Sequence, residues 1–105
     1  MATNRLDILK QMVAQDSNNT FARYGLAMEY AKSGQYQQAV EEFRTLIEKD
    51  ATYSAAYYHG GQALENLGRI EEARTIYEKG IEASTRKGDL HTRSEIEAAL
   101  NLLPI

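Results

Sequence analysis

The chain has 105 residues, of which 43% are hydrophobic, and its formal net charge is −3. This length fits one domain with its own core, and the interspersed acidic and basic residues argue against a basic surface for nucleic acid or anionic lipid. Cysteine is absent, which excludes disulfides, thiolate chemistry and cysteine-based zinc sites. At the N-terminus, charges at Arg5, Asp7 and Lys10 interrupt the apolar residues. We therefore expect neither a signal peptide nor a membrane span, and infer a cytoplasmic protein.

The first predicted element, residues 3–17, is a single helix that matches a segment thirty-four residues further along the chain. The matched positions of the first segment are Leu6, Asp7, Leu9, Lys10, Met12, Val13 and Asp16. They fall opposite Val40, Glu41, Phe43, Arg44, Leu46, Ile47 and Asp50, which agree with them in size and charge. The match covers only the second helix of the following hairpin, so residues 3–17 are predicted to form half a repeat.

Residues 18–51 and 52–85 are predicted to form two helical hairpins in one register. Apolar residues share one face of the second helix of the first hairpin: Tyr36, Ala39, Val40, Phe43, Leu46 and Ile47. The same spacing recurs in the second hairpin at Ile70, Ala73, Tyr77, Gly80 and Ile81. The first helices are expected at Asn19–Ser33 and Tyr53–Leu67. Each ends at a glycine, Gly34 or Gly68, that can adopt the left-handed conformation of a helix C-cap.

Small residues are expected where the two helices of each hairpin cross, because helices approach closely only where neither presents bulk. Ala27 is predicted to meet Ala39, and Gly61 to meet Ala73. Phe43 and Tyr77 are then expected to reach the neighbouring helices, so each hairpin completes its core only by stacking on the next.

A last amphipathic helix is predicted over residues 88–103, after a break at residues 87–89. Its apolar residues are Leu90, Ile96, Ala99, Leu100 and Leu103. This helix leaves the thirty-four-residue register, which is typical of a terminal cap.

Helical hairpins of this length, with glycines at their turns, resemble the tetratricopeptide repeat (TPR). The first repeat supplies Leu26, Ala27, Tyr30, Ala39 and Phe43, with Arg23 in place of the leading aromatic residue. The second supplies Tyr57, Gly60, Gly61, Leu64, Ala73 and Tyr77. Ala51 and Thr85 replace the closing proline, so the junctions between hairpins are expected to be less rigidly fixed. The resemblance implies one tetratricopeptide-repeat domain over residues 1–105, an all-α, right-handed superhelical stack of antiparallel hairpins with about six helices.

The sequence predicts no catalytic site, no metal site and no cofactor, and therefore no enzyme. The only histidines, His59 and His91, have no cysteine partner, and a single histidine on a helix is more often structural. The acidic pairs 41–42 and 71–72 are adjacent in sequence and lack the spacing of metal ligands. Gly60 and Gly61 lie inside a helical pattern rather than between a strand and a helix, so they do not form a phosphate-binding loop.

A second apolar stripe on the first helix of each hairpin is the candidate functional feature. In the first hairpin it comprises Phe21, Tyr24, Met28 and Ala31, and the corresponding face of the second holds Ala55, Tyr58, His59, Gln62 and Glu65. In the tetratricopeptide family these faces line the concave groove that receives peptide segments of partner proteins. The resemblance therefore implies a partner-binding groove formed by Phe21, Tyr24, Met28, Tyr58, His59, Gln62 and Glu65.

The sequence is compatible with several possible occupants of this face. The expected function is a non-enzymatic protein–protein interaction module that binds a peptide or amphipathic helix of another protein. The alternatives are a homodimeric scaffold or an accessory domain of an enzyme complex, each using the same groove, or permanent cover by the last helix. Aromatic and thioether walls favour an apolar or aromatic segment. Neither nucleic acid nor a membrane is an expected partner.

Overall fold

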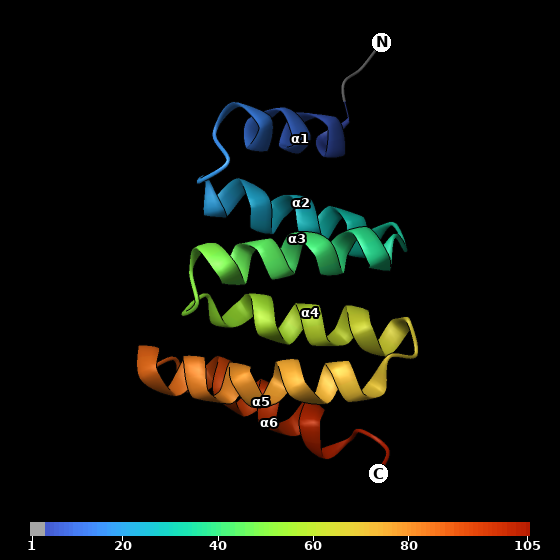
Figure 1. The fold of residues 1–105 in the computed structure, drawn as a ribbon, viewed down its shortest axis with the longest axis vertical. Coiled ribbons are helices and arrows are strands. Elements are labelled where there is room, and N and C mark those ends of the chain that lie inside the picture. The colour runs from blue at the N-terminus through green and yellow to red at the C-terminus, as the bar shows by residue number, and fades with distance from the viewer. Residues whose placement is uncertain (1–3) are drawn as a thin grey trace.

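The computed structural model describes residues 4–105, which fold into six α-helices without a strand. The helices are α1 (Arg5–Gln15), α2 (Thr20–Lys32), α3 (Tyr36–Lys49), α4 (Ser54–Asn66), α5 (Ile70–Lys87) and α6 (Leu90–Asn101). They stack along an axis of 47 Å, with α1 and α6 at opposite ends of the stack (Figure 1). The predicted all-α stack of antiparallel hairpins is confirmed. The predicted starts of the first helix, at residue 3, and of the domain, at residue 1, lie outside the described residues.

Helix boundaries follow the predicted ranges closely, with one difference. Both α2 and α4 begin one residue after the predicted start and end one residue before the predicted end. The helix α5 continues to Lys87, beyond the predicted end of the second repeat at residue 85, and has 18 residues where α3 has 14. This extension moves the start of α6 out of the repeat register.

Three glycines with positive φ make the tight turns, namely Gly34 (78°), Gly68 (75°) and Gly88 (77°). In each turn the residue after the glycine donates its N–H to the carbonyl five residues earlier, at 2.8, 2.9 and 2.9 Å. This is the Schellman pattern of a helix C-terminus, in which glycine avoids the steric cost of the left-handed conformation. The predicted turns at Gly34 and Gly68 are confirmed, and the break before α6 has the same geometry.

The hairpins stack through aromatic side chains that occupy space left by glycines. Phe43 of α3 is fully buried, and its Cβ lies 3.3 Å from the position that a Cβ on Gly60 of α4 would take. Phe43 therefore reaches the next hairpin, as expected. At the C-terminal end, Ile96 and Leu103 are buried, whereas Leu90 is 65% exposed. The expectation that Leu90 belongs to the apolar face of the last helix is wrong, because this residue lies at the turn where α6 begins.

Gly61 makes room for the ring of Tyr77, a contact that the sequence did not predict, while its predicted contact with Ala73 stays a prediction. A Cβ on Gly61 would lie 2.1 Å from Cε1 of that ring, which is an impossible contact. The Tyr77 hydroxyl donates a hydrogen bond to the Glu65 carboxylate, one turn further along α4. Burial, together with this acceptor, raises the pKa of Tyr77. The ring is therefore fixed at both its face and its hydroxyl.

Arg23 is buried at the position where the repeat pattern has an aromatic residue. Its Nη1 lies 2.6 Å from Oε1 of Glu42, and its Nη2 donates to the carbonyl six residues upstream at 3.2 Å. Tyr57, thirty-four residues later, donates its hydroxyl to the carbonyl six residues upstream of itself at 2.7 Å. The counterpart of Glu42 in the second repeat is Ile76. Arg23 and Tyr57 therefore make the same hydrogen bond, to the carbonyl six residues upstream, at equivalent positions of the two repeats.

Gly60→Ala and Gly61→Ala form a matched pair that tests the packing of Tyr77. Both changes remove a mid-helix glycine, which favours the helix by about 1 kcal/mol. Only at Gly61 does the new methyl group overlap a fixed ring, so we expect this variant to lose about 1–3 kcal/mol of unfolding free energy. The unfolding free energy of the Gly60 variant should change less. Urea unfolding followed by circular dichroism measures both, and equal stabilities would contradict the placement of the Tyr77 ring.

The equivalence of Arg23 and Tyr57 predicts a compensated double substitution. Glu42→Ile alone leaves the buried Arg23 guanidinium without its charged acceptor, which should cost about 1.5–3 kcal/mol of unfolding free energy. Adding Arg23→Tyr copies the second repeat's pair into the first and should recover most of that loss, because apolar replacement of a buried ion pair is often neutral or better. Thermal and urea unfolding of the two variants provide the test. A double variant less stable than the single one would refute the equivalence.

Candidate functional site

The candidate site is the surface formed by α2, α4 and α6, which we call the groove face. Within the described residues, α2 and α4 contact each other, and α6 packs against α4 and α5 without a backbone contact to α2. The last helix therefore extends the row begun by α2 and α4, and it does not lie over α2. Two hollows follow from this arrangement, one on each side of α4.

The α2–α4 hollow has a volume of about 470 Å³. It is lined by Met28, Glu29, Ala31, Lys32, Tyr36, His59, Gln62, Ala63 and Asn66. Its acidic wall residue Glu29 is paired with Arg5 of α1 at 2.8 Å. The charge of Glu29 is therefore compensated, and the remaining walls are mostly apolar or amide groups.

The α4–α6 hollow is slightly smaller, at about 380 Å³. It is lined by Tyr58, Gln62, Glu65, Glu95, Ala98, Ala99 and Leu102. Gln62 belongs to both hollows, and its Nε2 donates to the Tyr58 hydroxyl at 2.9 Å. The two hollows therefore adjoin across α4.

An aromatic cluster lies between the hairpins beneath the groove face, with His59 at its centre. The His59 ring lies 5.0 Å from the Tyr58 ring, 6.0 Å from Tyr24 and 6.4 Å from Phe43, measured between centroids. Burial lowers the pKa of His59, although the negative charge of Glu95 opposes this shift. Burial also raises the pKa of Tyr24, as do Tyr53 and Glu95 to a smaller extent. Both side chains are therefore uncharged at neutral pH.

The structure brings together five of the seven residues predicted for the groove. Met28, His59 and Gln62 line the α2–α4 hollow, and Tyr58, Gln62 and Glu65 line the α4–α6 hollow. Tyr24 is half-buried in the aromatic cluster and lines neither hollow. Phe21 lies outside both hollows and is 78% exposed.

Sequence reasoning missed the wall contributed by α6, which consists of Glu95, Ala98, Ala99 and Leu102. The sequence predicts a cap because this helix leaves the repeat register: α6 begins 36 residues after α4, two more than the repeat length. Allowing for that shift of two residues would have placed α6 in the row of first helices.

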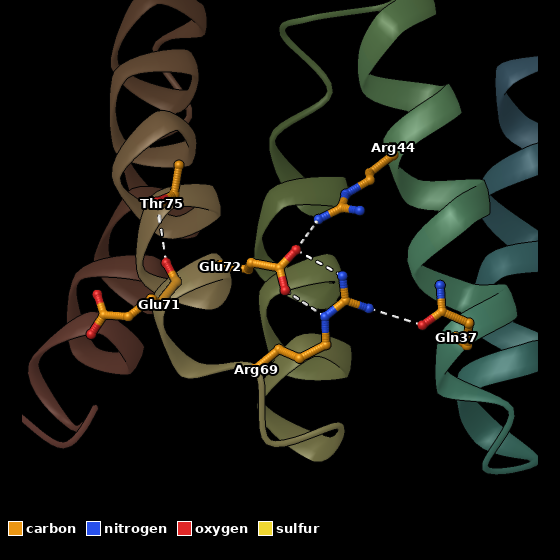
Figure 2. A network of polar contacts seen from close by, with 6 residues as sticks. All are labelled: Gln37, Arg44, Arg69, Glu71, Glu72 and Thr75. Atoms are coloured by element: carbon orange, nitrogen blue, oxygen red, sulfur yellow. Dashed lines mark hydrogen bonds and ion pairs between the residues drawn. The ribbon is translucent and has the colours of Figure 1, made fainter.

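The opposite face carries another hollow of about 450 Å³, between α3 and α5. Its lining residues are Arg44, Ile47, Glu48, Tyr57, Glu71, Glu72, Thr75, Ile76 and Lys79. At its rim Glu72 accepts hydrogen bonds from Arg69 and from Arg44, the latter at 2.9 Å, while Arg69 also donates to Gln37 at 2.9 Å (Figure 2). The Arg69 and Arg44 guanidinium groups lower the pKa of Glu72 to about 2. This network joins the two hairpins, and the two arginines compensate the charge of Glu72.

Asp89 fixes the beginning of α6 against α4. One carboxylate oxygen accepts the Thr92 N–H at 3.1 Å, and the other accepts the hydroxyl of Ser54, the first residue of α4, at 2.6 Å. The hydrogen bonds from Ser54 and Thr92 lower the pKa of Asp89 to about 2. The position of the α6 wall therefore depends on this ionised carboxylate.

Residues 4–105 contain no group of three or more histidine, aspartate or glutamate residues placed to hold a metal ion. None of the helices in this part of the chain is long and apolar enough to cross a membrane.

Comparison with known proteins gives consistent matches. A family model described as "Tetratricopeptide repeat" matches residues 24–87. A TPR repeat-containing protein of Pseudomonas aeruginosa is 30% identical over 95 residues, which cover 90% of each chain. A heat-shock protein cognate co-chaperone of Aspergillus fumigatus is 30% identical over 83 residues, or 79% of this chain and 24% of the co-chaperone. The solution structure of a Bordetella parapertussis protein superposes with a TM-score of 0.82 at 29% identity, covering 95% of this chain and 87% of that one.

The Asp89 contact predicts a specific dependence of stability on pH. Because folding lowers its pKa, ionised Asp89 stabilises the fold above its ordinary pKa of 3.8, and this contribution is lost as the pH falls towards about 2. Asp89→Asn should therefore lower the unfolding free energy at pH 6, by an amount on the order of 1 kcal/mol, and match the parent protein near pH 2. Urea unfolding across this range measures the difference.

Glu78→Gln, at an exposed position of α5, is the control for the loss of one carboxylate. Its effect on the unfolding free energy should be small at every pH between 6 and about 2. If the stability difference caused by Asp89→Asn does not change with pH, the carboxylate does not hold α6 in the way described.

Proposed function

Because the chain belongs to the tetratricopeptide repeat family, we propose that it is a non-enzymatic protein-interaction module whose groove face binds a peptide segment or helix of a partner protein. One observation carries this proposal. The row of first helices remains open, since α6 packs beside α4 instead of over α2, and two adjoining hollows lie on this row. Concave surfaces with apolar walls and a few polar groups are the usual form of a binding site.

The two hollows give the groove face a form suited to a polypeptide. They adjoin across α4 and share Gln62, so a segment crossing the helices can place one side chain in each. The wall residues Met28 and Tyr58 offer apolar area, and the Tyr58 hydroxyl and the Gln62 amide also offer hydrogen bonds. Such a combination of a few polar groups with apolar walls favours recognition of peptide side chains. The similarity to a co-chaperone supports a protein as the partner.

The test uses a probe peptide selected on the protein from a random 12-residue library. Met28→Ala with Tyr58→Ala removes one wall from each hollow, and truncated interface anchors typically cost about 2 kcal/mol. We expect the selected peptide to bind this double variant more than tenfold more weakly, as measured by fluorescence anisotropy. Circular dichroism should show nearly unchanged helicity.

Thr75→Ala with Lys79→Ala is the matched control on the α3–α5 side, where both side chains are exposed. This variant should bind the peptide as the parent protein does. Loss of binding only in this control would place the interaction on the opposite face and overturn the proposal. Light scattering on the same samples tests the alternative that the chain self-associates through the groove face. If the parent protein is a dimer and the Met28/Tyr58 variant is a monomer, the partner is a second copy of the chain.

A further inference from the structure

The α4–α6 hollow differs from its neighbour in its charge. Its lining includes two carboxylates, Glu65 from α4 and Glu95 from α6, and no lysine or arginine. The α2–α4 hollow has Lys32 in its lining, and its one carboxylate is paired with Arg5. The groove face is therefore acidic at the α6 end and nearly balanced at the α2 end.

Both carboxylates belong to the walls of the hollow, and a hydrogen bond restrains one of them, Glu65. Glu65 accepts the hydrogen bond of the buried Tyr77 hydroxyl, which fixes its orientation on α4. Glu95 faces it from α6, where His91 lies 3.6 Å away with a side chain that is 88% exposed. The charge of Glu95 also reaches the aromatic cluster, because it contributes to raising the pKa of Tyr24 and opposes the lowered pKa of His59. Two carboxylates from different helices therefore line this one hollow.

Apolar groups lie between and beside these charges. Leu102 is 85% exposed, Ala98 is exposed, and the half-buried Tyr58 ring completes the wall. A lysine or arginine side chain matches this mixture, because its aliphatic stem can cover apolar surface while its cationic end meets the carboxylates. A purely apolar side chain would desolvate the carboxylates without compensation, and an acidic one would be repelled.

From this match of shape and charge we propose that the α4–α6 hollow receives a lysine or arginine side chain of the partner segment, while the α2–α4 hollow receives an apolar one. The groove then selects segments in which a basic residue lies close to an apolar residue, and rejects acidic segments of the same hydrophobicity. This inference rests on the proposed function and adds the chemistry of its ligand.

The experiment compares two labelled 12-residue probe peptides with the same alanine and leucine positions, one carrying lysine and the other glutamate at the remaining positions. Fluorescence anisotropy at low salt should show at least tenfold tighter binding of the lysine peptide. This preference should shrink as salt screens the charges. Glu95→Lys should weaken binding of the lysine peptide about tenfold or more, and Glu95→Gln should have an intermediate effect.

Glu78→Lys on α5 is the matched control, because it changes the net charge equally and lies outside both hollows. It should leave the affinity for the lysine peptide within about twofold of the parent value, a difference well below the tenfold step of 1.4 kcal/mol. Equal weakening by Glu95→Lys and Glu78→Lys would overturn the inference, because only net charge would then matter. It is also overturned if the lysine peptide does not bind, or if the glutamate peptide binds as well.

The Met28/Tyr58 double variant separates this failure from failure of the proposed function. If that variant loses both peptides while the Glu95 variants bind them normally, the groove binds peptides without selecting charge, so only the present inference falls. If both peptides bind the double variant as they bind the parent protein, the groove face is not the binding surface. Both proposals then fall together.

Discussion

The insertion of aromatic rings into spaces left by glycines is the contact on which the rest of the stack depends. Tyr77 occupies the space above Gly61, and Phe43 packs against Gly60 in the next hairpin. On α5, a Cβ at Gly80 would lie 2.6 Å from Cβ of Tyr57 and 2.9 Å from Cδ1 of Ile96, so a glycine again permits three helices to meet. Phe43 and Ile96 therefore complete the core of the second hairpin from the helices on either side of it, whereas Tyr77 fills the space between that hairpin's own two helices.

Polar contacts then fix how successive hairpins join. Neither repeat ends in the proline of the family pattern, and the structure holds its junctions with side chains instead. Arg44 and Arg69 share Glu72 across the α3–α5 side, while Ser54 and Asp89 connect the beginnings of α4 and α6. The contacts of Arg44 and Arg69 with Glu72 are exposed, so their contribution to stability is modest. The contact between Ser54 and Asp89 involves a buried serine, so it constrains the position of α6 more closely.

The groove face gains its particular chemistry from the last helix. Within α2 and α4 the face is aromatic and amide-rich, and burial lowers the pKa of His59, which favours its uncharged form. Placing α6 beside α4 adds Glu95 opposite Glu65 and supplies the apolar surface of Leu102. The same hydrogen bond that fixes Tyr77 in the core also orients Glu65 in the groove. Core packing and the charge of the candidate site are therefore coupled through one side chain.

Sequence alone determined the helices, their turns and the repeat, because these depend on local spacing: apolar residues every three or four positions, and glycine where φ must be positive. It also identified the face that carries Met28, Tyr58 and Gln62. Only the tertiary structure decided which residue fills the space at Gly61, since Ala73 and Tyr77 both lie on the inner face of α5 and the crossing geometry selects between them. It likewise decided that α6 lines the groove, because the longer α5 shifts the register by two residues and conceals the equivalence of α6 with α2 and α4. The charge of this hollow was beyond the sequence for the same reason: Glu65 and Glu95 are separated by thirty residues and line one hollow only when the helices stack.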